Sequence, residues 1–457
     1  MKKFVLPLSL MLALVGCSVF PVEPDTPPSA SVAKDPGVRG GAAGAGGSLV
    51  GLTETELAFF NAGKDDFAEV ENVANGLGPT MNLDSCAGCH VQPAVGGTSP
   101  AVNPQVAFAT KMNATNIVPS FITPNGPVRE ARFVKNPDGT LDGGVHDLFT
   151  IAGRSDAPGC ALAQPDFATE LAHGNVIFRI PTPTFGAGLI EYIQDSVILA
   201  NYTSEPTAKA ALGIGGRPNI VLPFHATSGQ PNKNGNDGTL GRFGWKAQNK
   251  SLLVFSGEAY NVEMGITNEA FQTERDETPT CQFATIPNDV TKLDSPTLLE
   301  GLSAIEKFAF FMRFLAPPTP SPDTPGGAES IARGQSLFSS IGCALCHTPT
   351  LQTGNATVAA LRNQPVQLYS DLLIHDMGAG LTDGIAQGQA GPREFRTAPL
   401  WGLGQRLFFL HDGRTADVRV AILAHQSKGS EANAVIRQFN RLPEHQKQDV
   451  LNFLRSL

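Results

Sequence analysis

Two short cysteine–histidine motifs carry the clearest chemistry in this chain. Residues 86–90 have the sequence CAGCH, and residues 343–347 have the sequence CALCH. This C-x-x-C-H spacing is the signature of covalent c-type haem attachment. Two thiols one helical turn apart reach the two vinyl groups on one porphyrin edge, and the adjacent histidine lies under the iron as its ligand. The residues expected to hold haem are Cys86, Cys89, His90, Cys343, Cys346 and His347.

One such motif in a cytosolic chain could instead be half of a zinc site or a redox dithiol. Two of them in a chain with an export signal favour haem. The sequence therefore predicts two covalently bound haem c groups as cofactors.

The N-terminus has the pattern of a targeting segment. Lys2 and Lys3 precede an apolar run, residues 4–15, that is too short to cross a bilayer as a mature helix. The run ends in Leu-Val-Gly followed by Cys17, which looks like a bacterial lipobox. We expect residues 1–17 to be a lipoprotein signal peptide with Cys17 lipidated. The alternative is a plain signal peptide in which the cysteine is incidental.

The residues after Cys17 indicate the destination of the protein. Ser18 follows, and no aspartate stands at the second position, which favours sorting to the outer membrane. We expect an exported lipoprotein that faces the periplasm and is held on the membrane by its lipid anchor. Cys160 and Cys281 could form a disulfide in this oxidising compartment, or could remain two separate thiols.

Composition and periodicity predict a mainly α fold with long loops and a few short strands. The chain has 48 Gly and 35 Pro, and residues 18–50 are rich in Pro, Gly, Ala and Ser, as in a disordered tether. Helical periodicity over residues 298–315 ends at a proline-rich stretch. We expect two cytochrome c-like haem domains: residues 51–316, heavily elaborated by a large insertion, and residues 317–457.

The charge balance excludes one class of partner. Lys and Arg total 33 against 42 Asp and Glu, so the net charge is −9, and no basic run appears. This argues against nucleic acid as a partner.

Several stretches together make the sequence resemble the diheme oxidoreductase family, also called thiol oxidoreductases, which is related to bacterial diheme cytochrome c peroxidases. The resemblance covers nearly everything from residue 50 to the end. Its distinctive stretches are residues 179–183 (RIPTP), 185–191 (FGAGLIE), 243–247 (FGWKA), 263–267 (EMGIT), 369–378 (YSDLLIHDMG) and 410–414 (LHDGR).

The resemblance implies a second ligand for the C-terminal haem. In the peroxidases a His-Asp-Gly turn leads into a helix that supplies this ligand, usually a methionine. Here His411 begins the turn, and His425 stands at the ligand position. Ligation by two histidines would lower the haem potential relative to His/Met ligation. The alternative is that His425 is a capping or surface histidine.

The resemblance also implies catalytic residues. Trp245 matches a tryptophan between the two haems, and Glu263 matches a glutamate that serves in peroxide cleavage by acid–base catalysis. Phe255 stands where the peroxidases have a glutamine, so efficient peroxidase activity is in doubt. The alternative makes Trp245 a core aromatic and Glu263 a salt-bridge partner.

The first haem departs from the peroxidase pattern, because no histidine lies between His90 and His146. It is then expected to stay open, as in the related enzyme that matures tryptophan-derived quinone cofactors. Other candidate ligands are Met112, His146, His173 and Met264. We expect His375, Met377 and His411 near the C-terminal haem without binding its iron. Calcium between the haems has no support, because Phe408 occupies the place of a proline in the peroxidases.

Two hypotheses follow. The first is a peroxidase-like enzyme in which electrons enter at the C-terminal haem and chemistry occurs at the N-terminal haem. The second is a non-catalytic diheme electron-transfer lipoprotein. Either would need a redox partner protein, for which a small cytochrome or a cupredoxin is expected.

Overall fold

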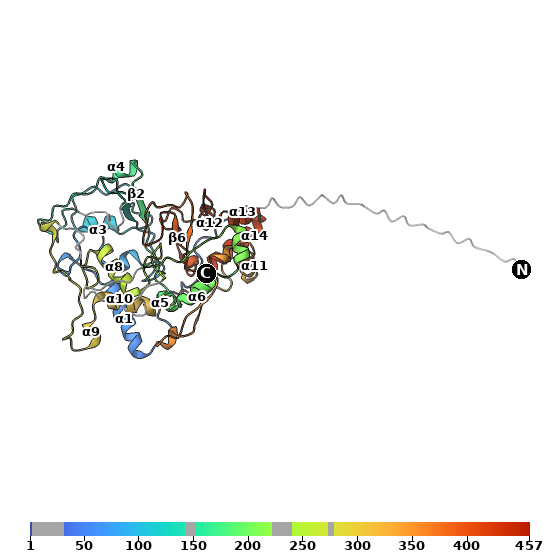
Figure 1. Cartoon of the computed structure of the whole chain (residues 1–457), viewed down its shortest axis with the longest axis horizontal. Coiled ribbons are helices and arrows are strands. Elements are labelled where there is room, and N and C mark those ends of the chain that lie inside the picture. Colours follow the sequence, from blue (N-terminus) through green and yellow to red (C-terminus); the bar gives the residue numbers. More distant parts are fainter. Residues whose placement is uncertain (2–31, 142–151, 222–239, 273–277) are drawn as a thin grey trace.

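The computed structural model describes residues 1, 32–141, 152–221, 240–272 and 278–457. Short helices joined by long loops dominate this part of the chain (Figure 1). The α-helices are α1 Glu54–Ala68, α2 Cys86–Cys89, α3 Gln105–Lys111, α4 Phe167–Ala172, α5 Ala187–Tyr192, α6 Asp195–Tyr202, α7 Pro206–Leu212, α8 Leu252–Met264, α9 Leu298–Gly301, α10 Ala304–Phe314, α11 Ala328–Ser340, α12 Val418–Ala424, α13 Asn433–Arg441 and α14 Glu444–Ser456. The expectation of a mainly α fold with few strands is confirmed.

The strands form three small antiparallel pairs. They are β1 Glu130–Phe133 with β2 Val176–Arg179, β3 Leu351–Gln352 with β4 Pro365–Val366, and β5 Ile374–Asp376 with β6 Glu394–Arg396. Each pair closes a loop between its two strands, and the longest of these loops lies between β1 and β2.

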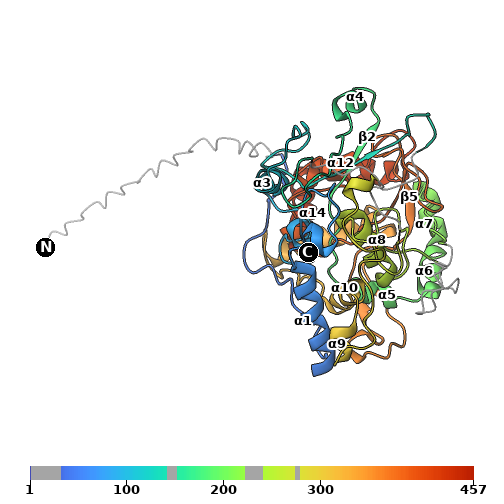
Figure 2. The ribbon, with the colours of Figure 1, turned by 90° about the vertical axis from the view of Figure 1, so that its left-hand side faces the viewer.

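In the N-terminal half, α1 lies beside α10 in both views of the ribbon (Figures 1 and 2). Thr53 caps α1 through a capping box with Glu56, which fixes where the helix begins. Phe60, Gly63 and Phe67 are the buried residues of α1, and their spacing places them on one face. A Cβ on Gly63 would lie 2.1 Å from the Lys307 carbonyl oxygen, so only glycine allows this close crossing.

The C-terminal half repeats this arrangement with α11 and α14. Gly334 is the close-approach residue, because a Cβ there would lie 2.0 Å from the Asp449 carbonyl oxygen. Phe338 of α11 packs against Phe453 of α14, with ring centroids 5.4 Å apart. Each half therefore brings a helix that precedes a C-x-x-C-H motif against a helix at the end of that half.

The two halves are not separate globules. The main hydrophobic core contains Phe308 and Phe311 of α10, but also Leu361, Leu373 and Trp401 from beyond residue 317. Apolar side chains of the second half thus complete the core of the first. The boundary expected at residue 317 marks a break between helices, but the core continues across it.

Residues 32–50 differ from the expectation of a disordered tether. Asp35 forms an ion pair with Arg455 of α14 at 2.6 Å and accepts the backbone N–H of Val418. Further along, the backbone N–H of Leu49 donates to Phe314. A buried ion pair and these hydrogen bonds hold the segment against the folded body. The expected signal peptide, Cys17 and the rest of the tether lie outside the described residues.

Cys160 and Cys281 are joined by a disulfide across 121 residues of sequence. Among the described residues, no helix has the length and apolar run needed to cross a membrane.

The close helix crossing at Gly334 predicts that the stability of the fold is sensitive to any side chain at this position. Replacing Gly334 with alanine should lower the free energy of unfolding by about 1–3 kcal/mol, because the added methyl group forces α11 away from α14. Gly47 is a matched control, since a Cβ there would meet no atom within 4 Å, and Gly47→Ala should change stability by less than about 0.5 kcal/mol. Denaturant unfolding measures both, and equal stability of the two variants would contradict the argument.

Candidate haem sites

The first motif forms the single turn α2, and His90 follows as its C-terminal cap. His90 is buried, and its Nδ1 lies 3.1 Å from the Gly97 carbonyl oxygen. Its Nε2 lies 3.8 Å from a carboxylate oxygen of Glu263, at the end of α8. The Phe67 ring of α1 packs edge-on against the imidazole. Because Nδ1 is bonded to Gly97, the opposite ring nitrogen, Nε2, points away from Gly97 and toward the Glu263 carboxylate.

The second motif begins as a short 3-10 turn, residues 343–345, and has the same local design. His347 Nδ1 lies 3.0 Å from the Tyr369 carbonyl oxygen, and the Phe338 ring packs against the imidazole. Cys343, Cys346 and His347 lie on the wall of a cavity of about 1420 Å³, which we call the larger cavity. Its lining is mostly apolar, as a haem pocket requires.

His425 lines the same cavity as His347. It caps the C-terminus of α12, and its Nδ1 lies 2.8 Å from the Ala421 carbonyl oxygen, while its Nε2 has no hydrogen-bond partner among the described residues. Burial lowers the pKa of His347 to about 4 and also lowers the pKa of His425, so both imidazoles are neutral. A neutral imidazole with Nδ1–H bonded to a carbonyl is the form that binds a metal.

The motif cysteines are in an environment that disfavours zinc. Burial raises the pKa of Cys86 and Cys89, and raises the pKa of Cys343 to about 12. Zinc binds thiolates, and burial disfavours the thiolate form of Cys86, Cys89 and Cys343. Within the described residues, no group of three or more His, Cys, Asp or Glu side chains could hold a metal ion.

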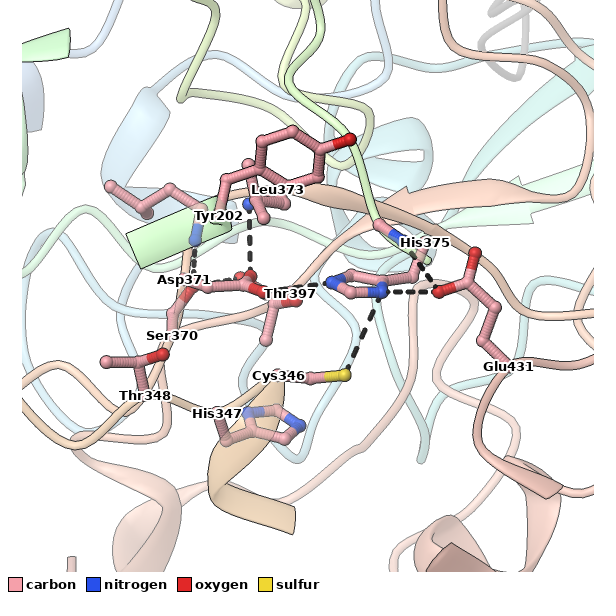
Figure 3. A network of polar contacts seen from close by, with 12 residues as sticks. Tyr202, Cys346, His347, Thr348, Ser370, Asp371, Leu373, His375, Thr397 and Glu431 are labelled. Carbon is pink, nitrogen blue, oxygen red and sulfur yellow. Dashed lines mark hydrogen bonds and ion pairs between the residues drawn. The ribbon is translucent and has the colours of Figure 1, made fainter. Parts of the chain in front are cut away.

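His375 is held between two carboxylates beside the second motif (Figure 3). Its Nε2 lies 3.0 Å from Asp371, and its Nδ1 lies 2.8 Å from Glu431. Burial alone would lower the pKa of His375, but Cys346, Asp371 and its hydrogen bonds raise it well above the usual value. Both ring nitrogens are occupied, so His375 stands beside the motif as a cation and has no nitrogen free for iron.

Glu431 extends this network to the other half of the chain. Its carboxylate also accepts the backbone N–H groups of Gly215 and Gly216, each at 2.9 Å. Met377 and His411 line the larger cavity as well. The His411 ring stacks on Phe395 with centroids 4.4 Å apart. The three residues expected near the C-terminal haem therefore all lie around this cavity.

Trp245 lies on the wall of two cavities. It lines the larger cavity and also a smaller one of about 550 Å³. Thr184, on the smaller cavity's wall, donates a hydrogen bond to Gly96 in the loop after His90. The wall of the smaller cavity is thus fastened to the loop that follows the first motif. The Trp245 indole N–H donates to the Ile180 carbonyl oxygen at 3.0 Å, which fixes the plane of the ring.

A buried charge cluster next to Trp245 holds this wall together. Asp383 accepts from Arg179 at 2.7 Å and pairs with Lys246 at 3.1 Å, and all three side chains are at most 3% exposed. Burial lowers the pKa of Lys246 to about 8, a shift that Asp383 opposes. The cluster joins the end of β2, the Trp245 loop and the loop before β6. These contacts join residues that are distant in sequence, so no motif in the sequence indicated a role for Asp383.

Phe255, in the place of the expected glutamine, lines the smaller cavity and stacks on Phe243 with centroids 5.9 Å apart. It presents no polar group there. Among the other candidate ligands of the first haem, Met264 is buried in the main core and His173 caps α4. His146 lies outside the described residues.

Comparison with known proteins identifies the family. The family model described as "Di-haem oxidoreductase, putative peroxidase" matches residues 130–457. The chain belongs to this family. As a di-haem oxidoreductase it uses haem cofactors and takes part in electron transfer.

Two other comparisons add little to this assignment. No curated protein matches the chain. A chain of hydrazine synthase from Kuenenia stuttgartiensis, in a structure pressurised with xenon, is 20% identical over 36% of this chain, with a TM-score of 0.23. The match covers 56% of the hydrazine synthase chain.

Removing the charge of Glu431 should loosen the second site of this di-haem oxidoreductase. We expect Glu431→Gln to lower the free energy of unfolding by about 1–3 kcal/mol, because His375 loses one of its two charged partners. Glu329 is a matched control, since its side chain is 97% exposed, and Glu329→Gln should have almost no effect. Denaturant titration of both variants measures the difference, and a stable Glu431→Gln protein would exclude a structural role for the network.

Proposed function

We propose that the protein is a periplasm-facing diheme c-type cytochrome with peroxidase-like activity. One observation carries this proposal: the two motifs have different surroundings. The larger cavity holds His347 and a second histidine, His425. Nε2 of His90 faces the carboxylate of Glu263 instead. One site thus offers two imidazoles that could hold a haem iron, and the other offers one imidazole and a nearby carboxylate.

The residues on each side fit a covalently held haem c. Cys86 and Cys89 would bind one group with His90 as ligand, and Cys343 and Cys346 the other with His347 and His425. When bound, the haem at His347 and His425 would accept electrons, and the haem at His90 would use them to reduce peroxide. Apolar walls and neutral imidazoles in the larger cavity support this assignment.

Glu263 is the proposed acid–base group. Its side chain is 47% exposed, so it can exchange protons with solvent. Its carboxylate oxygen would take the proton of one peroxide oxygen and return it to the other, so that two electrons and two protons convert one peroxide into two waters. Trp245, held rigid by its hydrogen bond to Ile180, is proposed to provide the electron path between the two sites.

The proposed location follows from the N-terminal sequence. A lipid on Cys17 would anchor the protein to the outer membrane. Residues 32–50, which pack against the folded body, would connect that body to the lipid-bearing N-terminus. A small cytochrome or a cupredoxin is the proposed electron donor.

The alternative function is non-catalytic electron transfer. The aromatic side chain of Phe255 on the smaller cavity favours it, because a peroxide-reducing site gains from a polar group there. The two functions predict different spectra.

We expect the purified protein to carry two covalent haems and to show a high-spin ferric band that changes rapidly with hydrogen peroxide. The band belongs to the open site, so it should persist in the variant Cys343→Ala/Cys346→Ala, which loses the second haem. Intact mass and optical spectra measure both. Purely low-spin spectra that do not respond to peroxide would leave only the electron-transfer function.

The role of Glu263 can be tested separately. Glu263→Ala should reduce peroxide turnover by about 10²–10⁴-fold, the usual contribution of a positioned acid–base group, while both haems remain attached. Glu69, an exposed residue next to α1, provides the control variant Glu69→Ala, which should keep full turnover. Unchanged turnover in Glu263→Ala would remove this carboxylate from the mechanism.

A further inference from the structure

Two arginines on the wall of the larger cavity have no carboxylate partner among the described residues. Arg396 and Arg406 both line the larger cavity, and both also line the smaller cavity. They therefore lie on the wall that the two cavities share with Trp245. Neither was singled out by the sequence, because no local pattern marks them.

Arg396 stands at the end of β6, where its backbone N–H donates to the Trp245 carbonyl oxygen. Its guanidinium group donates to the carbonyl oxygens of Gly244 at 2.9 Å and Thr397 at 3.5 Å. These neutral acceptors orient the side chain but do not balance its charge.

Arg406 has fewer interactions. Its guanidinium group makes no hydrogen bond or ion pair within the part of the chain that the structure describes, although its backbone carbonyl accepts from Arg455. Burial lowers the pKa of Arg406 to about 10, and burial together with the nearby Arg406 lowers the pKa of Arg396 to about 10. Two like charges are thus placed close together on an apolar wall.

Other buried cations in this region are treated differently. Arg179 and Lys246 share Asp383, and Arg242, also on the wall of the smaller cavity, pairs with Asp195. The protein supplies a carboxylate for each of these cations. Arg396 and Arg406 are only partly buried and have no such partner among the described residues, so their charges on the cavity wall can pair with an anionic occupant of the cavity.

We propose that Arg396 and Arg406 bind the two propionate carboxylates of the haem attached at Cys343 and Cys346. Haem carries two such carboxylates on one edge, which matches two adjacent guanidinium groups in number and sign. This inference rests on the proposed second haem. Trp245 lines the same cavity wall, so the arginines would hold the two carboxylates on the wall that carries Trp245.

The arginines would also tune the haem's redox behaviour. Positive charge near the iron favours the ferrous state and raises the reduction potential. Ligation by His347 and His425 acts in the opposite direction. The two guanidinium groups therefore offset part of the lowering that a second histidine causes.

The test is a redox titration of each haem in Arg406→Gln. We expect the ferrous-to-ferric ratio of the second haem at a fixed potential to fall about tenfold, a downward shift of about 59 mV for one electron. The first haem should shift less. Arg406→Lys, which keeps the positive charge, should restore most of the potential.

Arg437 provides a matched control for charge alone. It lies exposed on α13, the helix whose Val435 and Ile436 line the larger cavity. Arg437→Gln should leave both potentials unchanged. If Arg406→Gln does not load haem, Arg396→Gln is expected to show the same downward shift.

The outcomes distinguish this inference from the proposed function. Two attached haems with potentials unmoved in Arg406→Gln and Arg396→Gln would overturn the role of the arginines and leave the proposed function intact. An equal shift in Arg437→Gln would also overturn it. Absence of the second haem from the wild-type protein, shown by intact mass, would overturn both.

Discussion

The Asp383 carboxylate, enclosed by Arg179 and Lys246, is the interaction on which the arrangement of the two sites depends. These side chains come from three separate segments and are almost completely buried. Breaking a buried pair leaves an uncompensated charge and costs about 3–5 kcal/mol. The cluster therefore keeps the three segments together, and it holds the Trp245 loop on the wall shared by the larger and smaller cavities. The six stretches that carry the family resemblance are distant in sequence, and several of them meet at this wall.

Each half of the protein uses the same means to present its motif histidine. A glycine lets two helices cross closely, a phenylalanine of the first helix packs against the histidine, and a backbone carbonyl binds Nδ1. Different residues then face Nε2. The carboxylate of Glu263 lies there in the first half, while His425 shares the cavity in the second. A repeated scaffold thus supports two sites with different chemistry, which is the basis of the proposed division between electron entry and catalysis.

Charge on the cavity walls follows a consistent rule. Where a cation has a structural task, as Arg179 and Arg242 do, the chain provides a carboxylate. His375 is balanced by two, Asp371 and Glu431. The uncompensated charges lie where a charged cofactor is expected. The charges of Arg396 and Arg406 on this wall are those that the proposed haem propionates would balance.

The sequence by itself determined the two C-x-x-C-H motifs, the helical periodicity over residues 298–315 and the mainly α character, because these depend on local spacing and periodicity. It did not determine the core that crosses residue 317, the packing of residues 32–50, or the partners of Asp383. Such contacts join segments that are distant in sequence, and no local pattern in either segment predicts its partner. Only the tertiary structure decided that His375 is occupied by carboxylates while Nε2 of His425 has no hydrogen-bond partner in the described part of the chain, since the role of a histidine depends on what its two nitrogens meet in space.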